Sequence, residues 1–133
     1  MSVNSAEVEY LSSPAVKELN VPFSEAVRVG DLLFLSGQLG NLPGQFQLVE
    51  GGITPETRQT MDNIKATLNR YGADMDNVVK CTVFMADISE WPKMNEVYKT
   101  YFSKNFPARS AIAGGGLAMG ARVEIECIAH VGQ

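Results

Sequence analysis

The chain has 133 residues, of which 45% are hydrophobic and 20% charged, and its formal net charge is −4. This length predicts a single domain over residues 1–133 with enough apolar side chains for one core. The acidic balance disfavours nucleic acid as a partner, and no run approaches the roughly 20 apolar residues that span a bilayer.

The N-terminal segment carries no recognisable targeting signal. It includes Glu7, Glu9 and Glu18, and lacks both the apolar core of a signal peptide and the acid-poor, Arg-rich character of a transit peptide. We therefore expect a cytoplasmic location.

The cysteine and histidine content gives no metal site. Cys81 and Cys127 both lie in strand-like runs, which predicts buried, reduced thiols. The single histidine, His130, is expected to be a surface or packing residue. Without a CxxC pair or a second histidine, no ligand set for zinc is present, and we expect no metal.

The first predicted elements form a β-hairpin. The runs Val27–Val29 and Leu32–Leu35 flank Gly30-Asp31, a turn-forming pair. Ser36-Gly37-Gln38 ends the second strand, and residues 41–52, rich in glycine, proline and amides, are expected to form a loop.

A helix is predicted to start at Thr54-Pro55-Glu56. Thr54 is the expected N-cap, Pro55 fits the first helical position, and Glu56 is favourable near the positive end of the helix dipole. Gly72 is the expected stop. The apolar stripe of this helix, at spacings of three and four, consists of Met61, Ile64, Leu68 and Tyr71.

A strand and a second helix follow. In residues 78–87, Val79, Cys81, Val83 and Met85 alternate with Lys80 and Thr82, while Phe84 adds an apolar residue to the second face, which predicts a central strand. A helix then begins around Ser89, with Pro92 in its first turn. Its apolar stripe, interpreted as core packing, consists of Trp91, Met94, Val97, Tyr98, Tyr101 and Phe102.

The last two predicted strands carry the charges of greatest interest. Arg109 begins one of them, directly after Phe106-Pro107-Ala108. Glu124 and Glu126 alternate with apolar residues in the other, so both acids project from one face. Arg109 is either an interface ion-pair partner or a ligand anchor, and Glu124 is either an interface acid or a functional one. The intervening Gly114–Gly116 run provides either flexibility or an anion-binding nest of backbone amides.

This order of elements, strand-strand-loop-helix-strand-helix-strand-strand, predicts an α+β fold with two helices packed on one face of a β-sheet. The opposite face is too apolar for a free surface and too charged for a core, which favours a subunit interface. Its residues are Lys80, Thr82, Phe84, Glu124, Glu126 and Ile128.

Several ordered blocks between Pro22 and Val131 resemble the RidA/YjgF family of enamine/imine deaminases, formerly called translation-inhibitor or L-PSP proteins. Each block alone is weak, but together and in order they are specific. The blocks are Pro22-Phe23-Ser24, Phe34-Leu35-Ser36-Gly37-Gln38, Met61-Asp62-Asn63-Ile64, Val79-Lys80-Cys81-Thr82-Val83-Phe84, Met94-Asn95-Glu96-Val97-Tyr98, Phe106-Pro107-Ala108-Arg109-Ser110 and Val123-Glu124-Ile125-Glu126-Cys127-Ile128-Ala129.

The resemblance implies a chorismate-mutase-like α+β subunit in a homotrimer, with the sheets forming a barrel core and a cleft at each subunit interface. The implied activity is hydrolysis of reactive 2-imino acids, such as 2-iminobutanoate and 2-iminopropanoate, to 2-keto acids and ammonia without a metal or organic cofactor. The implied partners are therefore a small imino or keto acid and further copies of the chain.

Carried over residue by residue, the resemblance assigns Arg109 to the substrate carboxylate and Glu124 to the attacking water. Ser36 and Asn95 match further positions that line the cleft. Glu126 receives no catalytic role.

Three features depart from the family pattern. Phe23 stands where a tyrosine is common, Ala111 stands where a cysteine is common, and Gly114–Gly120 replaces the usual turn before the last strand. These changes leave open two alternatives to the deaminase. One is a non-enzymatic small-carboxylate-binding or chaperone-like protein, and the other is the endoribonuclease activity associated with the L-PSP name.

Overall fold

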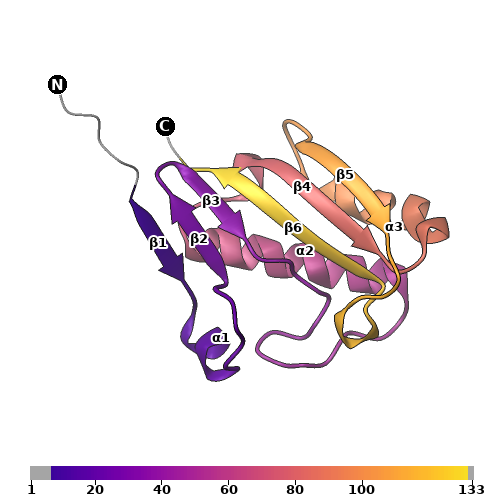
Figure 1. Cartoon of the computed structure of the whole chain (residues 1–133). Helices are drawn as coiled ribbons and strands as arrows, with labels where there is room; N and C mark the ends of the chain where they lie inside the picture. Colours follow the sequence, from indigo (N-terminus) through magenta and orange to yellow (C-terminus); the bar gives the residue numbers. More distant parts are fainter. Residues whose placement is uncertain (1–6, 132–133) are drawn as a thin grey trace.

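A computed structural model describes residues 7–131, which form one six-stranded sheet with helices (Figure 1). The sheet order is β1-β2-β3-β6-β4-β5, and only the β4–β5 pair is parallel. The helices and strands are β1 (Val8–Leu11), α1 (Pro14–Glu18), β2 (Ala26–Val29), β3 (Leu32–Leu35), α2 (Ile53–Arg70), β4 (Val78–Met85), α3 (Trp91–Tyr98), β5 (Ala108–Ala113) and β6 (Val123–His130).

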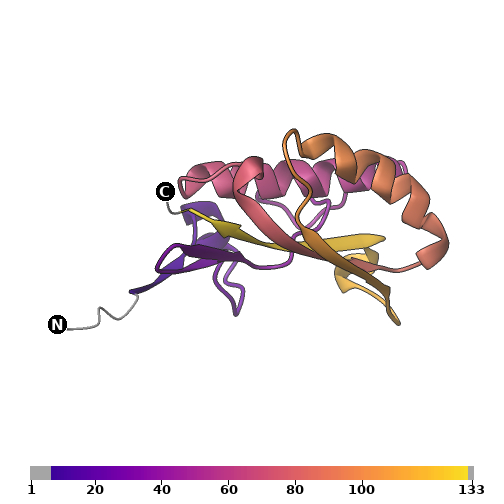
Figure 2. The ribbon, with the colours of Figure 1, turned by 90° about the horizontal axis from the view of Figure 1, so that it is seen from above.

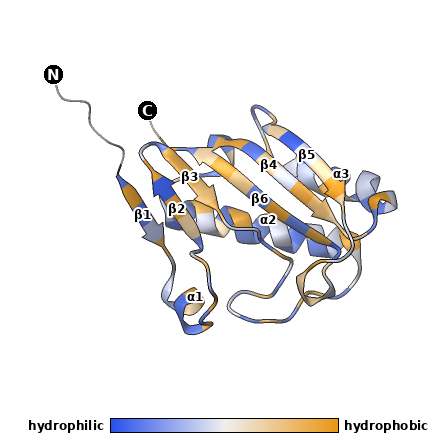
Figure 3. Cartoon of the chain, in the orientation of Figure 1, coloured by the Kyte–Doolittle hydropathy of each residue, from blue (hydrophilic) through white to orange (hydrophobic). Residues whose placement is uncertain are grey.

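The two longer helices, α2 and α3, cover the same face of the sheet, as Figure 2 shows. The core lies between them and the central strands β3, β6 and β4, which are largely hydrophobic with isolated hydrophilic positions (Figure 3). The predicted α+β fold, with two helices on one face, is confirmed. None of the helices in residues 7–131 is long and apolar enough to cross a membrane.

The predicted hairpin and the predicted helix stop are both confirmed. Strands β2 and β3 pair in antiparallel register around Gly30, whose φ is +57°. Helix α2 ends just before Gly72, which has a φ of +86° and lies one residue past the Tyr71 C-cap. The backbone N–H of Ala73 donates to Leu68 O at 2.9 Å, which closes the helix end.

The predicted start of α2 is wrong by two residues. The helix begins at Ile53 with Gly52 as its N-cap, and no side chain caps it. Gly52, at φ +92°, turns the chain so that Thr54 is already helical. Pro55 is accommodated because the first backbone N–H groups of a helix have no intrahelical partner.

Strand β4 is central, as predicted, because β6 and β5 flank it. The predicted alternation fails at Val79: its side chain is 46% exposed, whereas Val78 is buried. A register irregularity between Val78 and Lys80 shifts the alternation at this end of the strand. From Cys81 onward the alternation is as predicted.

Helix α3 begins at Trp91, after a short 3₁₀ turn at Ile88–Glu90, and keeps Pro92 in its first turn as predicted. Met94, Val97, Tyr98 and Phe102 of the predicted stripe are buried in the core. Trp91 is 41% exposed, so its assignment to the core is wrong.

Two N-terminal elements were not predicted. Strand β1 is a short edge strand whose alternation is masked because most of its residues are exposed. Helix α1 has five residues, a Ser13 N-cap and a proline in its first turn. The junction between the two elements is tied to the end of α2 by the buried carboxylate of Glu25, which accepts hydrogen bonds from Ser13 N at 3.2 Å, Arg70 Nη1 at 2.7 Å and Tyr71 Oη at 2.7 Å.

The two cysteines are free and buried, as predicted, and they face each other across β4 and β6. Their sulfur atoms lie 2.7 Å apart. This pairing could not be predicted from the sequence, because it depends on the register of strands that are distant along the chain.

Candidate active site

The face of the sheet that α2 and α3 leave uncovered carries the acids. In the β4–β6 register, Glu124 pairs with Phe84 and Glu126 pairs with Thr82. Directly opposed residues share a face, so these side chains point away from the helices. The mixed face predicted from the sequence is therefore one continuous surface.

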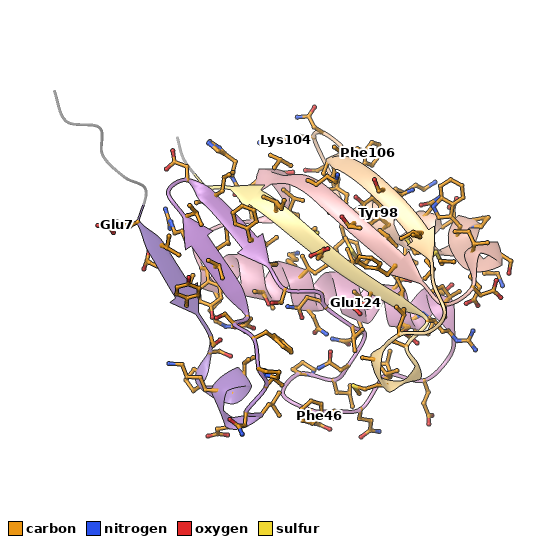
Figure 4. The ribbon with its side chains drawn as sticks, in the orientation of Figure 1. Glu7, Phe46, Tyr98, Lys104, Phe106 and Glu124 are labelled. Carbon is orange, nitrogen blue, oxygen red and sulfur yellow. The ribbon has the colours of Figure 1, made fainter. Side chains whose placement is uncertain are left out.

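Glu124 lies against the backbone of Gly37, where the chain leaves β3 (Figure 4). A Cβ atom at Gly37 would lie only 3.0 Å from Glu124 Cδ and 3.1 Å from Glu124 Cγ. Two hydrogen bonds fix this approach: Gln38 N donates to Ile125 O at 2.8 Å, and Ile125 N donates to Gln38 O at 3.0 Å. Only a residue without a side chain fits beside the carboxylate in this position.

The environment of Glu124 raises the pKa of its carboxyl group above the ordinary value. The larger cause is desolvation by burial, and the smaller is the negative charge of Glu126 on the same strand face. A carboxyl group with a raised pKa is better suited than an exposed glutamate to accept and then donate a proton near neutral pH.

Ser36 and Phe23 lie beside Gly37 but in different settings. Ser36 Oγ donates to Ser24 O at 2.6 Å, which ties the chain before β2 to the end of β3. Phe23 is 56% exposed and lines a hollow of about 140 Å³ together with Gly37 and Met119. We call Glu124, Gly37, Ser36 and Phe23 the acid cluster.

The altered segment Gly114–Gly120 contributes to the same hollow. Met119 has a φ of +60° and is 44% exposed, and it lines the same hollow as Phe23. Two of the three departures from the family pattern, Phe23 and the Gly114–Gly120 segment, therefore line the same hollow. Neither Phe23 nor Met119 has a side chain that can donate a hydrogen bond there.

Arg109 lies on the edge strand β5 and is held by α3. Its Nη1 donates to Asn95 Oδ1 at 2.7 Å. Its guanidinium carbon lies 4.8 Å from the centre of the Tyr98 ring and 5.8 Å from that of Trp91, within the range of cation–π attraction. We call Arg109, Asn95, Tyr98 and Trp91 the anchor cluster.

The anchor cluster borders a shallow hollow of about 240 Å³, whose lining also includes Phe106 and Pro107. Figure 4 shows Phe106 and Tyr98 near β5, at a distance from Glu124. Asn95 and the two rings fix the guanidinium on one side. Its remaining N–H donors can then bind a carboxylate in two-pronged geometry.

The aromatic members of the anchor cluster were interpreted from the sequence as core. Their spacing could have indicated a binding site, because residues 91, 95 and 98 lie on one face of a helix. A polar Asn95 side chain between two aromatic residues on that face is unusual for a hydrophobic core. The Tyr98 hydroxyl is buried and has no hydrogen-bond partner among residues 7–131. Burial raises the pKa of this hydroxyl far above its ordinary value.

The two clusters do not meet within one copy of the chain. Arg109 pairs with Cys81, which is buried on the helix-covered face, and Ala111 shares that face with Arg109. Glu124 is on the opposite face, two strands away and three positions along the register. At about 4.8 Å between strands and 3.3 Å per residue, the two Cα atoms are about 14 Å apart.

The remaining candidates lie outside both clusters. His130 is exposed at the end of β6, and Gly114, Gly115 and Gly116 are exposed in the segment after β5. Within residues 7–131, no three His, Cys, Asp or Glu side chains gather closely enough to hold a metal ion.

The chain is similar to known proteins over most of its length. Residues 15–131 match the family model described as Endoribonuclease L-PSP. The human 2-iminobutanoate/2-iminopropanoate deaminase is 45% identical over 84% of this chain and 81% of that protein. Reactive Intermediate Deaminase A, chloroplastic, from Arabidopsis thaliana is 36% identical over 97% of this chain and 69% of that protein. The crystal structure of RidA from an Antarctic Psychrobacter species covers 96% of this chain and 99% of its own, with 32% identity and a TM-score of 0.79.

Proposed function

The chain belongs to the Endoribonuclease L-PSP family, and from this premise we propose that it hydrolyses 2-imino acids to 2-keto acids and ammonia. The observation that carries the proposal is the acid cluster, in which a half-buried carboxylate of raised pKa is packed against a glycine. Similarity to the human deaminase supports the same reaction.

In the proposed reaction, Arg109 binds the carboxylate that every 2-imino acid carries. The Asn95 hydrogen bond and the two aromatic rings hold the guanidinium before the substrate arrives. Such preorganisation reduces the entropy lost on binding. It also fixes the position of the C=N carbon, which is bonded directly to the carboxylate carbon.

Glu124 then orients a water molecule and takes one of its protons as the oxygen bonds to the C=N carbon. The C=N π electrons move to nitrogen, Glu124 passes the proton to it, and a carbinolamine forms. Glu124 next takes the carbinolamine hydroxyl proton as the C=O bond forms and delivers it to nitrogen as the C–N bond breaks, which releases ammonia and leaves the 2-keto acid. One water is consumed, no electrons are transferred, and the reaction as written needs neither a metal nor an organic cofactor.

We further propose that Arg109 and Glu124 of one site come from different copies of the chain. They lie on opposite faces of one sheet, and the uncovered face that carries Glu124 is suited to burial against another copy. A homotrimer with a barrel core and three inter-subunit sites is the assembly that we propose. Ser36, Asn95, Phe23 and Ala111 would line these sites.

The location of the reaction is also part of the proposal. A cytoplasmic setting is consistent with the sequence, whereas the Arabidopsis relative is chloroplastic. The natural supply of substrate would be an enzyme that produces an imino acid by eliminating a group from an amino acid.

A second candidate is binding of a small carboxylate without turnover. It is favoured by Phe23 and Ala111, which stand where the family pattern commonly has a tyrosine and a cysteine and so supply neither a hydroxyl nor a thiol at those two positions. Binding of RNA has less support, because the net charge of −4 disfavours a polyanion.

A coupled assay tests the proposal. Threonine dehydratase generates 2-iminobutanoate, semicarbazide traps it, and semicarbazone formation is followed with and without this protein. We expect substoichiometric protein to suppress trapping, and Arg109→Ala to abolish the effect while the assembly stays intact. Calorimetric binding of 2-ketobutanoate without any suppression would instead support the carboxylate-binding alternative.

A further inference from the structure

Glu56 is a buried carboxylate that the proposed reaction does not use. It lies in the first turn of α2 and is only 4% exposed. Its Oε2 accepts hydrogen bonds from the backbone N–H groups of Arg122 at 2.6 Å and Val123 at 3.2 Å. A buried carboxylate is costly unless hydrogen bonds satisfy it, and here the donors are the first residue of β6 and the residue just before it. Glu56 is therefore attached to the main chain immediately before Glu124.

Glu56 also contacts the loop that packs against Glu124. A Cβ atom at Gly40 would lie 2.6 Å from Glu56 O and 2.7 Å from Glu56 Cγ, so the loop backbone passes directly over this residue. Three residues earlier, Gly37 of the same loop lies against the Glu124 carboxylate. Glu56 thus touches both segments that enclose Glu124, and Asn63 of the same helix holds the loop as well, by donating to Leu39 O at 3.0 Å and Asn41 O at 2.9 Å.

We propose that Glu56 is a positioning residue for Glu124, an inference that rests on the proposed imine hydrolysis. Without the Glu56 side chain, the N–H groups of residues 122 and 123 lose their acceptor, so the start of β6 is no longer fixed to α2, while the loop after Gly37 stays attached through Asn63 and only loses the packing of the Glu56 side chain against Gly40. Glu124 then leaves its packed position on Gly37. Arg109 lies on the other face, on β5, and is unaffected.

This arrangement predicts a specific kinetic effect. Because the acid moves and the anchor does not, kcat falls while KM stays close to that of the wild type. A displacement of about 1 Å at a catalytic group lowers the rate by about 10²-fold, so we expect Glu56→Ala to lower kcat by about 10- to 100-fold. Glu56→Gln keeps an oxygen acceptor in the same place and is expected to retain most of the rate.

Thr60→Ala is a matched control on the same helix. It removes the hydrogen bond from Thr60 Oγ1 to Glu56 O at 2.8 Å and leaves the contacts with β6 in place. A purely structural effect would lower the melting temperature of both alanine variants and leave both kcat values unchanged. If Glu56→Ala does not fold, Glu56→Asp, which withdraws the carboxylate by one methylene, replaces it and is expected to lower kcat by about tenfold.

A second measurement does not depend on activity. The pKa of Glu124 is read by carbon-13 NMR of labelled glutamate, with Glu124→Gln used to assign the signal. In the wild type this pKa is raised by burial. In Glu56→Ala or Glu56→Asp it is expected to fall towards the ordinary value, because the displaced carboxylate reaches solvent.

A folded variant with wild-type kcat and an unchanged Glu124 pKa overturns the inference. A wild-type protein that fails to hydrolyse imines overturns the proposed function instead. The NMR titration still decides in that case whether Glu56 positions Glu124.

Discussion

Replacing Gly37 by alanine tests directly whether the packed position of Glu124 matters. The new Cβ would lie 3.0 Å from Glu124 Cδ and 3.1 Å from Cγ, and it would overlap Oε2. Carbon atoms in ordinary contact lie about 3.5–4.0 Å apart, so the carboxylate must move by about 1 Å. A shift of that size at a water-orienting group is expected to lower kcat by about 10²-fold.

The fold is expected to tolerate this substitution. Gly37 does not adopt a positive φ, and the side chain that must yield is half-buried with a route to solvent. Overpacking at such a position costs no more than about 1–3 kcal/mol in the free energy of unfolding.

The assay is steady-state imine hydrolysis, accompanied by urea unfolding of each variant. Gly115→Ala is the matched control, because a Cβ atom there meets nothing within 4 Å, and it should leave kcat unchanged. A folded Gly37→Ala protein with the kcat of the wild type would refute the role given to Glu124.

Three further predictions concern the anchor, the acid and the thiols. Arg109→Lys keeps the charge but loses two-pronged binding and ring stacking, so KM for the imine should rise by about 10- to 100-fold, an increase that steady-state kinetics can measure. Glu124 must be ionised to orient water, so activity is lost as the pH falls through its raised pKa; Glu126→Gln removes one cause of that shift, and the acidic limb of the kcat profile should move to lower pH. Cys81 and Cys127 are buried, so both should resist a thiol reagent in the native protein and react only after unfolding.

The elements that follow from local rules were predictable from the sequence. The Gly30 turn, the Gly72 stop and the alternation in β6 each depend on residues close together in the chain. The order of strands in the sheet was not predictable in this way, because pairing of β6 with both β3 and β4 depends on long-range packing.

The site was only partly predictable for the same reason. The sequence pointed to Arg109 and Glu124, but it could not show that they occupy opposite faces of one sheet. That result required the register of β5 with β4 and of β4 with β6. Trp91 was misread because an aromatic residue at a core spacing can equally stack on a cation at the edge of the helix face.

The central claim is that each active site combines Arg109 of one copy with Glu124 of another. Arg109→Ala and Glu124→Gln proteins, each inactive alone, are co-expressed in equal amounts, and the mixed assembly is assayed for imine hydrolysis. With random assembly, each site receives an intact Arg109 and an intact Glu124 with a probability of about one half for each, so about a quarter of the wild-type activity should return. No recovered activity in a demonstrably mixed assembly would contradict the shared site.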